Sequence, residues 1–449
     1  MGQNILFVLF FISSWGYIIY RLYKQQKNSP LILIFYAALI TKTLAGFLHA
    51  AVFFFYYREG DLIAYHHDSI VLAKYALKHP LRFLEFFIWN TYIPLPDLEN
   101  FTIYNQPRAL LMLKVNSLLY LLAGEEIILV ILLLSTLSFW VTWLFTNELT
   151  SWFPNHKWEA YIAFLFFPSV LIWSSGINKE CYALISIYGI LWIVFRWKRL
   201  GINLNKEFLG GILLLFVFTY WLFQVKSYYF IVLGLCLGGW GIGEYLYKTS
   251  LRLNKPWIFP LLSIGIFLFF TIVFFSNSYK DFSFLGISQT IIKNHNVNYI
   301  LSSSQGLIHF YKVGKEAFIT LSPTLESFIV NSPLALISAL YRPFVWEAHN
   351  KLQLLAGIEN LVILLVSLQA IFLLFTSKIH VKNIFLLVFA LIYIILLAIL
   401  LAFSFPNLGS LNRLRVSFMP FFLYLLLIVV LPIWRTWWQA FQKRKQVVT

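Results

Sequence analysis

The sequence predicts an all-α fold: a polytopic membrane protein with about eleven transmembrane helices, plus interfacial or re-entrant helices on the external face. Hydrophobic residues make up 60% of the 449 residues, charged residues make up 12%, and the mean hydropathy is +0.77. This composition exceeds what the core of a soluble protein requires. Apolar runs also recur at the length that a helix needs to cross a bilayer, about 20 residues. A transmembrane barrel would show short alternating segments instead.

The apolar windows are spread along the whole chain, and neither a clear repeat nor a Gly/Ser-rich linker divides them. We therefore expect residues 1–449 to form a single membrane domain. The first window lacks a basic start and a small-residue cleavage site, so we expect a retained helix there and not a signal peptide. The windows lie near residues 4–22, 31–57, 127–147, 158–174, 179–196, 207–224, 228–247, 256–276, 356–376, 384–403 and 415–434.

The distribution of Lys and Arg predicts the orientation of these windows, because cytoplasmic loops retain positive charge. Basic clusters follow the first, fifth, seventh, ninth and last windows, which share one face only if the amino terminus is outside and the carboxyl terminus inside. Two long external segments then remain, 58–126 and 277–355. Each contains a short charged apolar piece, 108–123 or 331–346, which we expect to lie in the interface or to re-enter. If either piece crossed fully, the orientation downstream would invert.

The net charge of +16 is explained by these loops, and we exclude nucleic acid as a partner of so apolar a chain. The two cysteines, Cys181 and Cys236, fall inside predicted spans and lack metal-ligand spacing. They therefore indicate neither a disulfide framework nor a zinc site.

The first polar cluster is Arg58-Glu59-Gly60-Asp61, at the external end of the second window. Two carboxylates separated by a glycine can hold a divalent metal cation, or place one carboxylate as a general base beside a substrate hydroxyl. A solvated helix end with an Arg58 to Glu59 ion pair is the competing interpretation. His66 and His67 follow; adjacent helical positions point about 100° apart, so we expect only one of them, His66, to face a site. An interfacial histidine bonded to backbone or water is the alternative.

The second cluster is the turn Trp173-Ser174-Ser175-Gly176-Ile177-Asn178, followed at once by Lys179 and Glu180. Ser, Gly and Asn are ordinary turn residues. The two charges open a predicted span, where ionisable groups are expected to face a cavity. Lys179 at a helix start is therefore a candidate phosphate ligand.

The third and fourth clusters carry arginines on the face that the positive-inside rule leaves poor in them. Arg342, Trp346 and Glu347 combine a cation, an aromatic face and an acid, which suits a sugar. Arg413 and Arg415 precede the last window and can bind phosphate in two-pronged fashion. Aromatic belts and snorkelling of arginine to lipid headgroups are the alternatives.

The general layout resembles the GT-C class of membrane glycosyltransferases, which use polyprenyl-phosphate sugars. The resemblance rests on the acidic Glu-x-Asp of a long external loop, the following helix at 108–123, many spans and basic residues outside. It implies that Asp61 is the base or metal-organising acid, with Glu59 as its partner. The class has this loop after its first span, whereas here it follows the second. The Trp-Ser-Ser-Gly turn and the late Asn-Arg-Leu-Arg also resemble bacterial surface-polysaccharide proteins, including repeat-unit polymerases.

We therefore expect an integral protein of a bacterial plasma membrane that moves a sugar from a polyprenyl-phosphate-linked donor to an acceptor at the non-cytoplasmic face. Asp61 would act as the base, while Lys179, Arg413 and Arg415 would stabilise the departing lipid phosphate. A polymerase or ligase of lipid-linked oligosaccharides is the first alternative. A transporter or lipid flippase is the second, since paired charges and broken helices also occur there.

Overall fold

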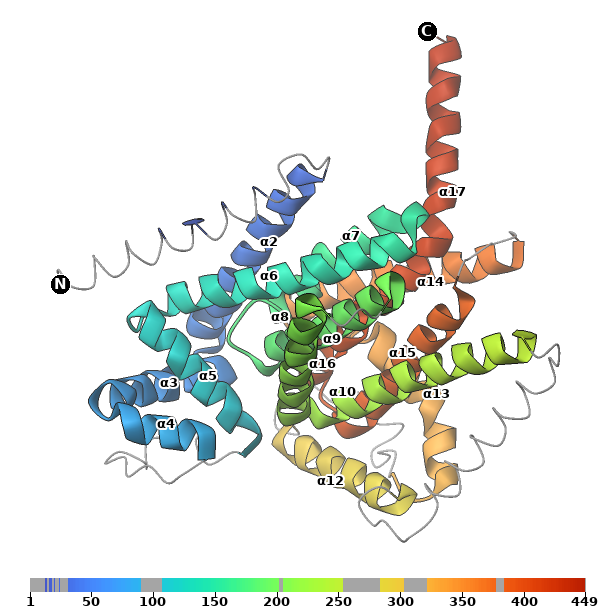
Figure 1. Cartoon of the computed structure of the whole chain (residues 1–449). Coiled ribbons are helices and arrows are strands. Elements are labelled where there is room, and N and C mark those ends of the chain that lie inside the picture. The colour runs from blue at the N-terminus through green and yellow to red at the C-terminus, as the bar shows by residue number, and fades with distance from the viewer. Residues whose placement is uncertain are drawn as a thin grey trace. The chain divides into compact units, whose positions relative to one another are not determined.

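In a computed structural model of the chain, the structure describes residues 31–89, 107–201, 205–252, 283–302, 321–376 and 383–448, with a few isolated positions before residue 31. All regular elements of these residues are helices, as Figure 1 shows. The prediction of an all-α membrane protein is thus confirmed. Seven of these helices are long and apolar enough to cross a membrane. They are α2 (Ile32–Ala51) with its continuation η1 (Val52–Tyr57), α6 (Ile127–Trp152), α9 (Lys179–Leu200), α10 (Lys206–Arg252), α14 (Lys351–Thr376), α15 (Ile384–Ser404) and α17 (Met419–Val448).

The seven helices account for eight of the eleven predicted windows. Windows 207–224 and 228–247 are joined in α10, which is interrupted by non-helical backbone at Lys226 (φ −148°, ψ 74°). Windows 4–22 and 256–276 lie outside the described residues. The count of about eleven spans therefore stays a prediction.

Window 158–174 is not one span, which corrects the sequence interpretation. It forms two short helices, α7 (Lys157–Leu165) and α8 (Pro168–Trp173). Pro168 begins α8 at a position where its missing N–H is no loss, and the preceding residue is extended. The proline thus ends the helix that average hydropathy predicted to be continuous.

The chain forms two compact units, residues 1–230 and 231–449, which are described separately. In unit 1, α6 packs against α2, α7 and α9. A second group of helices, α3 (Asp61–Lys78), α4 (Pro80–Trp89) and α5 (Pro107–Ala123), packs around α3. Buried aromatic side chains fill both groups, with Phe35 and Trp143 in the first and Tyr65 and Tyr120 in the second.

Helix α5 corresponds to the piece predicted at 108–123, and two of its polar residues, Lys114 and Asn116, are buried. The Lys114 side chain is buried, and its Nζ donates to the carbonyls of Phe86 and Phe87, at 2.6 and 2.9 Å. These carbonyls belong to the last turn of α4, which has no helical partner for them. Asn116 is also buried and accepts a hydrogen bond from Tyr182 of α9 at 2.5 Å. Lys114 and Asn116 thus join α5 to its neighbours.

In unit 2, α15 packs against α12 (Phe284–Ser302) and α13 (Leu325–Tyr341), and α14 packs against α17. The piece predicted at 331–346 divides into the end of α13, an extended stretch, and the short helix η5 (Val345–Glu347), which lies against α14. His295 and Asn298 of α12 bond the final carbonyls of α15, Phe403 and Ser404. Short helices α16 (Leu408–Leu414) and η6 (Arg415–Ser417) lead into α17.

Candidate functional site

The acidic turn of the first cluster lies between η1 and α3. Glu59 and Asp61 are both exposed, and Asp61 is the first residue of α3, where a helix favours negative charge. Gly60 has φ +116°, and a Cβ there would come within 2.9 Å of Cε1 in the Phe53 ring. Glycine is therefore required for this turn, which holds the two carboxylates at the surface of unit 1.

The histidine pair that follows divides as the helical spacing predicts. The His66 side chain is half-buried, and its Nδ1 lies 2.5 Å from the Tyr120 hydroxyl of α5. Burial, with a smaller contribution from the neighbouring His67, lowers the pKa of His66 below its usual value. His67 is exposed, and its Nδ1 lies 3.4 Å from the buried carboxylate of Asp68.

The Ser174–Asn178 turn lies buried between helices and is held by polar side chains. Ser135 and Ser138 of α6 donate to the backbone carbonyls of Ser175 and Ser174, at 2.8 and 2.7 Å. Backbone without helical bonds has to find such partners when it is enclosed within a membrane protein. This segment is therefore a broken helix, α8–turn–α9, inside unit 1.

Two ionisable residues of α2 also hold the turn, and the sequence analysis missed both. The buried Lys42 donates from Nζ to the Ser174 hydroxyl. The buried His49 places Nε2 3.3 Å from Nδ2 of Asn178. The Asn178 amide oxygen already accepts from the backbone N–H of Cys181 at 2.7 Å, so its nitrogen is the donor and His49 Nε2 the acceptor. A lysine and a histidine within an apolar window were the available signal.

The predicted pair Lys179 and Glu180 forms the first turn of α9, with Asn178 as its N-cap. Lys179 is half-buried, whereas Glu180 is buried and lies 3.2 Å from the buried Lys226 Nζ. Lys226 occupies the break in α10. An ion pair thus joins two interruptions of helical backbone, one at the start of α9 and one within α10.

The acidic turn and the Ser174–Asn178 turn meet through aromatic rings. The Phe53 ring that underlies Gly60 lies 5.0 Å from the His49 ring and 6.4 Å from the Trp173 ring, measured between centroids. His49 in turn contacts Trp173 at 5.3 Å. The first and second predicted clusters therefore belong to one region of unit 1, which we call the paired-turn site: residues 59–61 and 174–180 with Lys42, His49 and Phe53.

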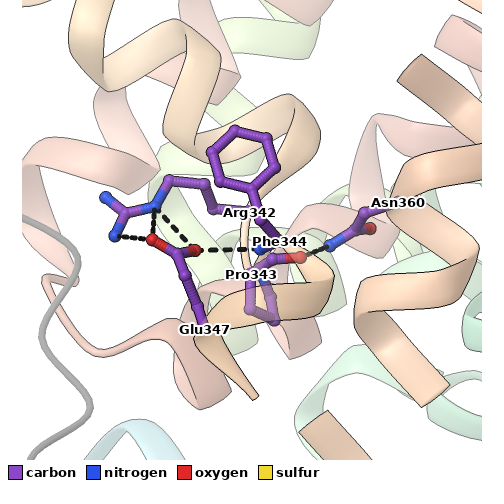
Figure 2. A network of polar contacts seen from close by, with 5 residues as sticks. All are labelled: Arg342, Pro343, Phe344, Glu347 and Asn360. Carbon is purple, nitrogen blue, oxygen red and sulfur yellow. Dashed lines mark hydrogen bonds and ion pairs between the residues drawn. The ribbon is translucent and has the colours of Figure 1, made fainter. Parts of the chain in front are cut away.

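The third cluster, in unit 2, is a closed network, which Figure 2 shows from close by. Arg342 is buried and donates from Nε to both Glu347 carboxylate oxygens, at 2.9 and 3.0 Å, and from Nη2 to Oε1 at 2.5 Å. Glu347 also accepts from the Phe344 backbone N–H at 2.9 Å, and Asn360 of α14 donates to the Pro343 carbonyl. The Arg342–Pro343 peptide bond is cis. Arg342 and Glu347, which we expected to bind a substrate, bind each other.

The fourth cluster meets the third at Arg415, whose side chain is fully buried. Its Nη1 lies 3.3 Å from the Arg342 carbonyl, and its Nη2 lies 3.8 Å from Oε1 of Glu359 in α14. Glu359 was missed because a single acid near the start of an apolar window is also expected of a helix terminus. Arg413 is half-buried.

Trp346 lies on the exposed side of the Arg342–Glu347 network. Its ring stacks on Phe344, with centroids 4.7 Å apart and planes 14° from parallel, and 72% of the side chain is exposed. Such a ring can cover a sugar face or lie in a membrane interface, as the sequence analysis proposed for it.

The metal site that the sequence left open has two candidate ligands, Glu59 and Asp61. Within the described ranges, no three His, Cys, Asp or Glu residues gather as a metal cluster would require. A divalent cation at the acidic turn would thus need further oxygen ligands, from substrate or water. Comparison of the chain with family models, with curated proteins and with solved structures gave no match.

Proposed function

We propose that this protein is a membrane glycosyltransferase that takes a sugar from a polyprenyl-phosphate-linked donor at the non-cytoplasmic face. The observation that carries the proposal is the paired-turn site. Exposed carboxylates at Glu59 and Asp61 adjoin, through Phe53, a buried broken helix that starts α9 with Lys179. An acid and a cation beside a membrane-embedded helix break are the groups that transfer from a lipid phosphate requires.

In the proposed reaction, the Asp61 carboxylate takes the proton of the acceptor hydroxyl. The acceptor oxygen forms a bond to the anomeric carbon, and the bond between that carbon and the phosphate oxygen breaks. Its electron pair stays on the phosphate, which leaves as polyprenyl phosphate and is stabilised by Lys179 and the helix start. In unit 2, Glu347 already occupies Arg342, and Arg415 is fully buried beside Glu359.

Replacing Asp61 by Asn tests this role. Membrane vesicles, which supply the cell's own acceptors, are given a polyprenyl-phosphate donor that carries a radiolabelled hexose, and the label leaving the lipid fraction is measured. We expect D61N to lose activity by about a hundredfold or more, since the base is removed while shape is kept. Glu207→Gln, at an exposed acid of the same unit, is the matched control and should keep full activity. Full activity of D61N would remove Asp61 from the mechanism, and loss of activity with EDTA would add a metal to it.

The transporter alternative has one observation in its favour. The buried Glu180–Lys226 pair connects two helix breaks, an arrangement also typical of transporters. Flux of a lipid-linked sugar across proteoliposomes, without any chemical change to it, would favour that function. The polymerase alternative relies on outer arginines and would instead show lengthening of a lipid-linked oligosaccharide.

A further inference from the structure

One face of α2 packs along the Ser174–Asn178 turn. Lys42, Gly46, His49 and Phe53 are spaced at i, i+4, i+7 and i+11, which places them on one side of the helix. Lys42 bonds Ser174, and His49 bonds Asn178. Each end of the turn thus has its own ionisable partner on α2.

At the middle of the turn, two glycines, Gly46 and Gly176, allow α2 and the turn to approach closely. A Cβ at Gly46 would lie 2.5 Å from the Ser175 carbonyl oxygen, and a Cβ at Gly176 would overlap the His49 ring. The helix and the turn therefore approach as closely as two backbones can.

Lysine and histidine are costly choices for a purely structural contact within a membrane span, because their burial is expensive. The α6 hydroxyls bond only backbone carbonyls of the turn, whereas Lys42 and His49 contact its side chains, at Ser174 and Asn178. The added groups fix the ends of the turn, and the residue directly after it is Lys179.

We propose that Lys42 and His49 are positioning residues that hold the Ser174–Asn178 turn against α2 and thereby set where Lys179 is presented at the start of α9. The positioning role concerns the structure of unit 1. Its use for catalysis rests on the proposed function, in which Lys179 stabilises the lipid phosphate.

The position of residue 179 can be measured without any substrate. In the full-length chain, Lys179→Cys is labelled with a charged maleimide; the native cysteines, Cys181 and Cys236, are buried. Adding Lys42→Met removes the ammonium at similar length, and adding Gly46→Ala pushes on the turn without changing charge. We expect each to alter the labelling rate about fivefold or more, since both loosen or displace the turn.

Three further variants separate positioning from general damage. Thr43→Val lies on α2 off this face, where the Thr43 hydroxyl bonds only the Leu39 carbonyl, and should leave labelling unchanged. His49→Gln keeps an acceptor for the Asn178 nitrogen and should label near the parent rate, whereas His49→Ala should not. Equal labelling of the parent, Lys42→Met and Gly46→Ala proteins would overturn the proposal.

The activity assay then distinguishes the two proposals. Lys42→Met in the native background should raise the KM for the radiolabelled lipid donor while the thermal transition of the protein is kept. Altered labelling with unchanged kinetics would leave the positioning role intact and contradict the use of Lys179 in transfer. Unchanged labelling with lost activity would overturn the positioning role.

Discussion

At the scale of single residues, the structure divides the predicted site into exposed and enclosed groups. Glu59, Asp61 and Trp346, which the sequence singled out as candidates, are exposed. Arg342 was selected because charge at a span is costly, but its partner Glu347 lies five residues away and neutralises it within the same turn. For Glu180, in contrast, the sequence gives the charge, but its partner Lys226 is identified only by tertiary packing.

His66 gives a pH prediction at this scale. Burial lowers the pKa of His66 below the value of about 6.5 that applies to the unfolded chain. Its contribution to stability is then complete above that value and is lost as the pH falls below it, because the unfolded chain takes up the proton more readily. The thermal unfolding temperature of the wild-type protein in detergent should therefore fall more between pH 7 and pH 5 than that of the His66→Gln variant. Parallel pH profiles would contradict the enclosed position of this ring beside Tyr120.

At the scale of elements, hydropathy predicted long helices well and interruptions poorly. The windows at 31–57, 127–147 and 179–196 are found with small shifts at their ends. The window at 158–174 failed at Pro168, because an averaged hydropathy does not register a missing backbone donor. The buried charge of Lys42 was likewise outweighed by its apolar neighbours in the sequence, whereas Lys226 fell between the windows 207–224 and 228–247. Both mark places where a helix meets or becomes irregular backbone.

Lys114 supplies a prediction about an element, since it closes the end of α4 from α5. Lys114→Met keeps the length of the side chain and removes both hydrogen bonds to the last turn of α4. We expect a loss of about 2 kcal/mol in the stability of the α4 end, seen as faster amide hydrogen exchange there. Lys74→Met removes only an exposed pair with Glu125 and should cost less than about 1 kcal/mol. Equal exchange in the two variants would rule out the capping role.

At the scale of the whole molecule, composition was enough to predict a helical membrane protein, and seven helices of the necessary length among the described residues confirm that class. The number of crossings is not fixed by windows alone. The apolar part of α10 has 44 residues, roughly 66 Å of helix, which is enough for two crossings. The orientation of every later helix depends on such counts, so it remains a prediction from the charges of the loops.

The orientation can be tested with two exposed positions. Glu59→Cys should react with a membrane-impermeant maleimide in intact cells, because the positive-inside rule places it outside. Lys248→Cys, which follows the seventh window, should react only after the membrane is permeabilised. Labelling of Lys248→Cys from outside would invert the later part of the predicted topology, whereas labelling of Glu59→Cys only after permeabilisation would move the proposed site to the other face.

The π-helical turn η1 determines the direction of the acidic motif that follows it. The bond from the Arg58 N–H to the Phe53 carbonyl spans five residues instead of four, so η1 contains one residue more than an α-helix would. Each residue advances a helix by about 100°, and the insertion therefore sets the direction in which the carboxylates leave α2. In a related sequence one residue shorter here, the same acidic motif would point elsewhere. The number of residues between Lys42 and Glu59 is thus a feature to compare across related sequences, together with the Glu-x-Asp motif itself.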